Sequence, residues 1–187
     1  MKRFGLAAVS LAVAALIGGC LFSRNDYVES EEFDLALPKK AAGPALRVGV
    51  FKNLSGSDRR FLVRLGDGQV AALEYQRWRL SPELLLQRCV YGAFRIAPDN
   101  DEARPRLNAV VYRFEFDERE NQACLAVDFL LPNNACAAAG NSASPLAVRA
   151  EFAVPVKDKG DLGAARAAAM SECARLAVEK LAAELKK

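Results

Sequence analysis

Three segments in the second half of the chain alternate between apolar and polar residues, which is the period of a strand that buries one face. They cover residues 110–117, 125–131 and 148–154. In the first of them, the alternation predicts that Val110, Tyr112, Phe114 and Phe116 point to one face. Shorter alternating runs cover residues 46–50 and 61–65. The turn Gly66-Asp67-Gly68 follows the second of these runs and predicts a hairpin over residues 60–77.

Two other segments carry apolar residues at helical spacing, over residues 81–96 and 160–187. The first opens with Ser81, Pro82 and Glu83, which supply a capping hydroxyl, a proline at the first helical position and an acid near the positive end of the helix dipole. Each helix therefore has one apolar face to bury.

The order of these elements is strands, helix, strands, helix, and each longer strand has a single apolar face. A sheet with one apolar face needs a cover on that face only. The sequence thus predicts an α+β fold of two layers. We expect a mostly antiparallel sheet of five to six strands, with two helices on one face, in one domain over residues 33–187.

The N-terminus has the pattern of a secretory signal. Lys2 and Arg3 precede an uncharged stretch of sixteen residues, which as a helix spans about 24 Å and is shorter than the roughly 30 Å core of a bilayer. The stretch ends in Leu16-Ile17-Gly18-Gly19-Cys20, which resembles a bacterial lipobox. We expect residues 1–19 to be the signal peptide and Cys20 to carry a diacylglycerol and palmitate. The alternative is an ordinary secretory cleavage site beside an incidental cysteine.

The residues after Cys20 indicate a location. Leu21 stands where an aspartate would signal retention at the inner membrane, so we expect an anchor in the inner leaflet of the outer membrane, with the protein facing the periplasm. Acyl chains contribute about 0.8 kcal/mol per buried methylene, so a triacylated Cys20 would hold the chain stably. The lipidated segment 20–32 is polar and lacks periodicity, which is typical of a tether.

Composition excludes several classes of function. The chain has 187 residues, with 26 Lys and Arg against 23 Asp and Glu. Its net charge of +3 falls by two when Lys2 and Arg3 leave with the signal peptide, which argues against a nucleic-acid partner. Histidine is absent, which removes imidazole bases and the commonest zinc ligands. We expect no enzyme activity, no cofactor and no metal site.

Four cysteines remain after Cys20, and four in the oxidising periplasm allow two disulfides. Cys89 and Cys173 lie on the apolar faces of the two predicted helices, so they either pair or stay as two buried free thiols. A second bridge between Cys124 and Cys136 is barely within reach of the chain. No Cys-x-x-Cys spacing occurs, which also argues against zinc.

Several motifs together resemble the ABC-type transport auxiliary lipoproteins, the PqiC/YmbA-like family. The family pattern has an aromatic-x-leucine start, an aspartate–arginine pair that opens a strand, and a tyrosine three residues before a tryptophan, just ahead of a proline-started helix. These positions are held here by Phe33 and Leu35, Asp58 and Arg59, Tyr75 and Trp78, and Pro82. The resemblance covers roughly residues 33–186.

The resemblance implies a periplasm-facing accessory subunit that works with an MCE-domain protein and an ABC permease in lipid transport between the two membranes. Tyr75 and Trp78 could form a partner surface, since aromatic residues are favoured anchors. The alternative is that Trp78 closes the core beneath the first helix. Two other functions stay open: a structural lipoprotein that assists outer-membrane or lipopolysaccharide assembly, and a hydrolase using a Ser-Lys pair or paired carboxylates. Whether the chain forms a homo-oligomer is also open.

Overall fold

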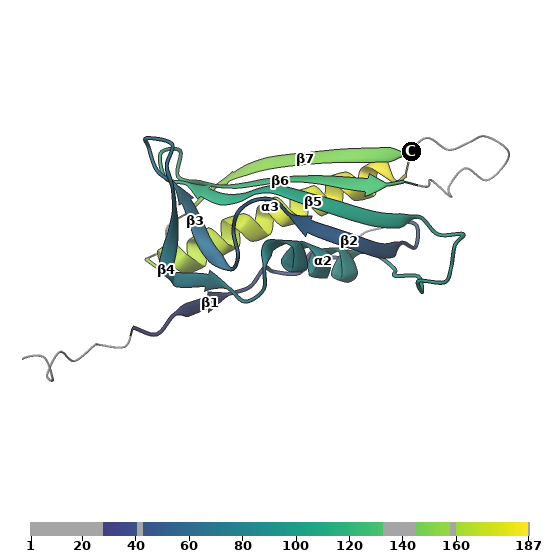
Figure 1. Ribbon diagram of the computed structural model, residues 1–187, viewed down its shortest axis with the longest axis horizontal. Helices are drawn as coiled ribbons and strands as arrows, with labels where there is room; N and C mark the ends of the chain where they lie inside the picture. The colour runs from purple at the N-terminus through teal and green to yellow at the C-terminus, as the bar shows by residue number, and fades with distance from the viewer. Residues whose placement is uncertain (1–27, 41–42, 133–144, 158–159, 187) are drawn as a thin grey trace, which may run out of the picture.

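The computed structural model describes residues 28–40, 43–132, 145–157 and 160–186, and within them a sheet and two helices form two layers (Figure 1). In chain order the elements are β1 (Glu31–Phe33), β2 (Arg47–Asn53), β3 (Arg60–Arg64), β4 (Val70–Trp78), α2 (Pro82–Ala93), β5 (Arg106–Asp117), β6 (Gln122–Leu131), β7 (Leu146–Pro155) and α3 (Leu162–Glu184). Both helices pack on the same face of the sheet, where their apolar sides share one core. The α+β fold with two helices on one face is therefore confirmed.

The described strands form one seven-stranded sheet in the order β1-β4-β3-β5-β6-β7, with β2 beside β5. The long strand β5 pairs with β6 on one side and with both β2 and β3 on the other. The pairs β3/β4, β5/β6 and β6/β7 are antiparallel and hold most of the paired residues, as expected. The pairs β1/β4, β2/β5 and β3/β5 are parallel, so the sheet is mixed rather than purely antiparallel.

The seventh strand is β1, which holds Glu31 and Glu32, two residues that the sequence assigned to the tether. β1 lacks an apolar alternation, and backbone pairing with Gln76, Arg77 and Trp78 forms it instead. The sheet thus includes two residues that precede Phe33.

Both helices are shorter than expected. α2 ends at Ala93 because Phe94 is extended, with φ −109° and ψ 159°. α3 begins after Asp161, whose side chain accepts a hydrogen bond from the Ala164 amide at 2.9 Å and so caps the helix. Within the described residues, neither helix combines the length and the apolar character that a bilayer crossing requires.

A bulge in β5 changes which side chains face the helices. The pairing with β6 shifts between Val111 and Arg113, so one extra residue enters β5 there. Phe114 and Phe116 face the core as expected, whereas Val111 rather than Val110 is buried there and Tyr112 is 46% exposed on the open face. The expectation that Val110 and Tyr112 share the face of Phe114 was therefore wrong.

The core is aromatic at one end. Trp78 packs between Phe61, with ring centroids 4.3 Å apart and tilted planes, and Phe114, with centroids 5.2 Å apart and an edge-to-face arrangement. All three residues are almost fully buried. Because α2 starts only four residues after Trp78, this cluster fixes the place where the chain leaves β4 and enters α2.

Candidate docking surface

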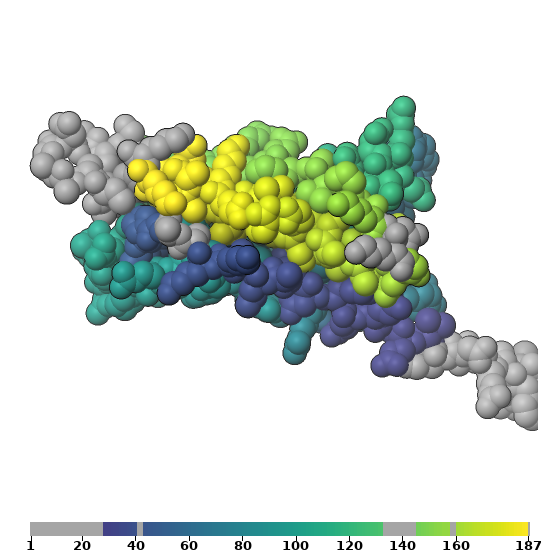
Figure 2. Space-filling model, turned by 180° about the vertical axis from the view of Figure 1, so that it is seen from behind, coloured from purple at the N-terminus to yellow at the C-terminus, as the bar shows by residue number. Residues whose placement is uncertain are grey.

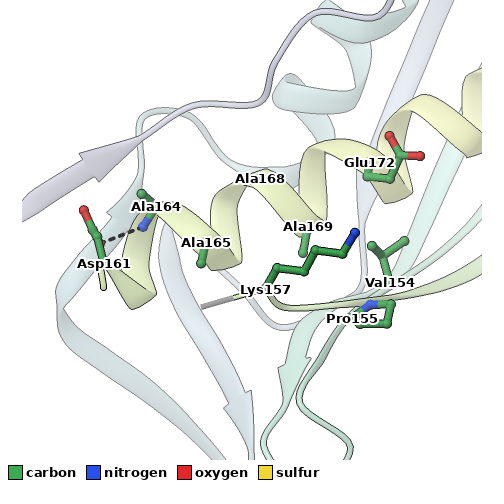
Figure 3. Close-up of a pocket in the computed structure, with 9 residues that line it drawn as sticks. All are labelled: Val154, Pro155, Lys157, Asp161, Ala164, Ala165, Ala168, Ala169 and Glu172. Carbon is green, nitrogen blue, oxygen red and sulfur yellow. Dashed lines mark hydrogen bonds between the residues drawn. The ribbon is translucent and has the colours of Figure 1, made fainter. Parts of the chain in front are cut away.

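A groove runs between β7, at the border of the sheet, and the first half of α3 (Figure 3). Its volume is about 360 Å³. Most of its lining is apolar, and the lining residues are Val154, Pro155, Lys157, Asp161, Ala164, Ala165, Ala168, Ala169 and Glu172. The groove exists because alanine side chains leave α3 narrow on this side, where larger residues would fill the space.

Charges stand at the mouth of the groove rather than on its floor. Lys157 extends along it toward Glu172 (Figure 3). The Glu172 carboxylate accepts two hydrogen bonds from Arg175, one from the arginine Nε at 2.7 Å and one from the arginine Nη2 at 2.5 Å. These bonds hold the pKa of Glu172 below its usual range, and the nearby charge of Lys157 adds to the effect.

A second groove, of about 640 Å³, lies on the other side of α3, against residues 36–39. Leu37 on its wall is 56% exposed. The backbone amide of Ala36 donates to the Ser171 Oγ at 3.0 Å, which holds this segment against the helix. Figure 2 shows α3 lying across this face with the N-terminal segment alongside it.

The two grooves share Ala168 and Glu172. We call the exposed side of α3 that carries Ala164, Ala168 and Glu172, together with Val154 and Leu37 on its two flanks, the α3 surface. An apolar strip with charges at its margin matches the usual anatomy of a protein contact, in which the centre is apolar and the rim is polar. The α3 surface therefore suits a protein partner that inserts apolar side chains.

The sequence offered one signal for this surface, which is the alanine-rich run at 164–169. Within this run, Ala164 and Ala168 are exposed. The segment at Leu37 that completes the surface lies far away in the sequence. Only the folded chain brings it beside α3.

The two aromatic residues predicted as a partner surface have different positions. Trp78 is fully buried in the aromatic core, so it does not contact a partner, and the core interpretation of this residue is the correct one. Tyr75 is 45% exposed and lies in an irregular part of β4, where one residue of β3, Phe61, stands opposite four of β4, residues 73–76. The structure therefore does not bring the two together on one surface.

The cysteines are free thiols wherever the structure describes them. Cys89 is buried in α2, whereas Cys173 in α3 faces the sheet, its Sγ 3.4 Å from the carbonyl oxygen of Ala123. Of the two alternatives for Cys89 and Cys173, the structure therefore shows the buried free thiols, with the Cys173 thiol directed at the backbone of β6. Burial raises the pKa of both thiols to about 12.

Cys124 is likewise a buried free thiol, and Cys136 lies outside the described residues, as does the predicted lipidation site Cys20. Burial also raises the pKa of Cys124. A buried thiol with a raised pKa is a poor nucleophile at neutral pH. In the described part of the chain, no three His, Cys, Asp or Glu side chains gather in a way that could hold a metal ion.

Comparison with known proteins supports the fold. No family model matches the chain. No curated protein matches it either. A crystal structure of an uncharacterized protein aligns with a TM-score of 0.62 and 13% identity, covering 84% of this chain and 99% of that one. The crystal structure of protein XCC0632 from Xanthomonas campestris, of the family DUF330, aligns with a TM-score of 0.59 and 17% identity, covering 81% of this chain and 92% of that one. At these identities, the likeness shows a shared fold.

Proposed function

We propose that the protein is a periplasm-facing lipoprotein of the outer membrane and an accessory component of an ABC/MCE-type system for lipid transport between the membranes. The observation that carries the proposal is the fold likeness to a DUF330 protein over four fifths of the chain. The PqiC-like family is the one designated DUF330, and it is also the family that the sequence motifs resemble. Two independent comparisons therefore favour the same family.

The mechanism we propose is positional. A chain held at Cys20 reaches β1 after ten residues, which span at most about 35 Å. The domain would thus stay close to the outer membrane, and its α3 surface would be held at a high local concentration for a partner that spans the periplasm. The expected partner is an MCE-domain protein or its ABC permease.

We also propose that the protein acts by binding a partner, and that it has neither enzyme activity nor a cofactor. The α3 surface combines short apolar side chains with a carboxylate already bound by Arg175. The described thiols are buried. Neither feature provides an activated nucleophile or a free acid–base pair.

The test is capture of partners from envelope membranes in mild detergent, with a tag at the C-terminus and mass spectrometry of what copurifies. The Cys20→Ala protein, which cannot be lipidated, serves as the control. We expect an MCE-domain protein or its permease to copurify with the lipidated chain. Recovery of only porins and assembly factors would contradict the proposal and favour a structural role in outer-membrane or lipopolysaccharide assembly.

A further inference from the structure

β7 forms one border of the sheet, and no other strand in the described part of the chain pairs with its outer side. The strand is ten residues long. A long border strand presents a row of backbone donors and acceptors to any strand that approaches it. Three of its apolar side chains on the helix-facing side, Leu146, Phe152 and Val154, are only half-buried, so this border would gain further burial from a neighbour.

We propose that β7 pairs antiparallel with β7 of a second copy of this chain, about a two-fold axis at Ala150. This pairing joins two sheets into one, with all four helices on the same face. In this register Arg149 stands opposite Glu151 of the second copy, and the symmetry repeats the pair. Opposite charges directly across an antiparallel pair are stabilising. The inference concerns the second copy alone and does not depend on the proposed transport role.

The charges of Arg149 and Glu151 favour the register centred on Ala150 over the neighbouring registers. Moving the axis to Glu151 places this carboxylate opposite its own copy, and moving it to Arg149 does the same for the guanidinium. Like charges directly opposite are destabilising. If the pairing were shifted by one residue, the apolar side chains of one strand would lie opposite the polar side chains of the other. Only the axis at Ala150 pairs opposite charges and keeps the faces matched.

The other side chains also match about Ala150. On the helix-facing side, Val148 meets Phe152 of the second copy and Leu146 meets Val154, so apolar side chains contact each other. Val154 is also a wall of the groove beside α3. Leu146 of the second copy would therefore enter the end of that groove and cover apolar surface that is open in the single chain.

Proline limits the paired stretch symmetrically. Pro145 precedes β7 and Pro155 is its last residue, each five positions from Ala150. Proline has no backbone N–H to donate, so the ladder ends at the same place in both directions. The strand thus offers a self-complementary segment, residues 146–154, with a proline at either end.

Charges on border strands commonly prevent pairing. Here the two charges have opposite signs and are two residues apart, with the Arg149 Nη2 3.9 Å from a Glu151 oxygen in the same chain. Their side chains are 70% and 61% exposed, so they can turn to a neighbouring strand. This pattern opposes most foreign strands but fits an antiparallel copy of itself.

The test is a charge exchange read by sedimentation velocity of the lipidated full-length protein in detergent, over a series of concentrations. The variants Arg149→Glu and Glu151→Arg each place like charges opposite each other twice. We expect each to raise the dissociation constant of the dimer about tenfold or more. The double variant, which exchanges both residues, restores the opposite pairs and should return the constant to that of the parent.

Mixing the two single variants gives an independent reading, because each supplies the charges that the other lacks. We expect the mixture to associate while each variant alone remains monomeric at the same concentration. A parent protein that is monomeric throughout, or single variants that associate as the parent does, would overturn the proposal. The second outcome would place the contact on another surface.

A cross-link in intact envelopes tests the register itself. Ala147 and Ala153, both exposed, stand opposite each other across the proposed axis. A double cysteine variant at these positions should form a covalent dimer on mild oxidation, since the two residues lie too far apart along one strand to bridge within a chain. Each single cysteine variant is the control. Equal cross-linking by a single variant would contradict this register.

Discussion

Arg64 on β3 donates two hydrogen bonds to the Glu115 carboxylate of β5, from Nε to Oε1 at 2.7 Å and from Nη2 to Oε2 at 3.1 Å. Arg113 adds a third bond to the same carboxylate, from its Nε at 2.6 Å. Glu115 is 5% exposed although it lies on the open face of the sheet, because the two guanidinium groups cover it. This network joins β3 to the end of β5, where only two residue pairs form the backbone ladder.

Removing this carboxylate should destabilise the fold. The Glu115→Ala variant leaves Arg64 and Arg113 side by side without their shared anion, and hydrogen bonds to charged groups contribute about 1.5–3 kcal/mol each. We expect the free energy of unfolding to fall by about 2–4 kcal/mol in urea. Glu74→Ala removes an exposed carboxylate from β4 and should change it by less than about 0.5 kcal/mol. Equal effects of the two changes would contradict a structural role for Glu115.

Tyr75 and Trp78, the two aromatic residues of the family pattern, should differ in how much each contributes to stability. Trp78→Ala opens a cavity among Phe61 and Phe114, and such changes cost about 3–5 kcal/mol of stability. Tyr75→Ala removes a side chain that is 45% exposed and should cost less than about 1 kcal/mol. Thermal unfolding of the two variants measures this difference. A stable Trp78→Ala protein would place the indole outside the core, against the structure.

The elements themselves were readable from the sequence because apolar periodicity decides which face is buried. The hairpin over β3 and β4 and the two helices lie where their patterns predict. The alternation of apolar and polar residues does not show, however, which residues of two neighbouring strands pair with each other. It could not reveal the bulge after Val111 that turns Tyr112 outward, or that β2 and β3 share one edge of β5. Both depend on pairing between residues far apart in the chain.

The site was harder to predict for a similar reason. Asp58 and Arg59 belong to the family pattern, and the structure shows a local role for the arginine, because the Arg59 Nε donates to the Trp78 carbonyl at 3.0 Å and its Nη2 to Glu32 at 2.8 Å. These bonds tie β1 to the end of β4. The α3 surface, in contrast, has no motif. It results from small residues on α3 and a distant segment at Leu37.

The three described thiols should all be available for labelling once the protein is unfolded. Cys89, Cys124 and Cys173 are free, and burial raises the pKa of each. We expect an alkylating reagent without reductant to leave them unmodified in the native protein and to modify all three in 6 M guanidinium, as read by peptide mass spectrometry. A peptide in which Cys89 is joined to Cys173 would contradict the free thiols.

The α3 surface can be blocked without disturbing the core. Ala168 is exposed and borders both grooves, so Ala168→Arg fills them with a long charged side chain. Ala183→Arg makes the same change at an exposed position near the end of the helix, outside either groove. In the envelope capture experiment, we expect Ala168→Arg to reduce partner recovery about tenfold and Ala183→Arg to leave it unchanged. Equal recovery with both variants would place docking on another surface.

The pH dependence of stability should carry a contribution from Asp58. Its carboxylate accepts hydrogen bonds from the backbone amides of Arg60 at 2.9 Å and Arg59 at 2.6 Å, and these bonds lower its pKa to about 2. In the unfolded chain the pKa of an aspartate is about 3.9. Because the folded pKa is the lower one, the stabilisation is complete above about pH 5 and is lost as the pH falls toward 2.

Asp58→Asn should therefore flatten the decline in unfolding free energy between pH 5 and pH 2, measured by urea unfolding at each pH. The effect will be small, because the Asp58 side chain is 64% exposed and solvent weakens its interactions. Asp99→Asn, in an exposed loop, is the matched control and should leave the decline as it is in the parent. If the unfolding free energy declined as steeply in Asp58→Asn as in the parent, other carboxylates alone would produce the decline. The backbone amides of Arg59 and Arg60 would then not stabilise the charged form of Asp58 in the native state.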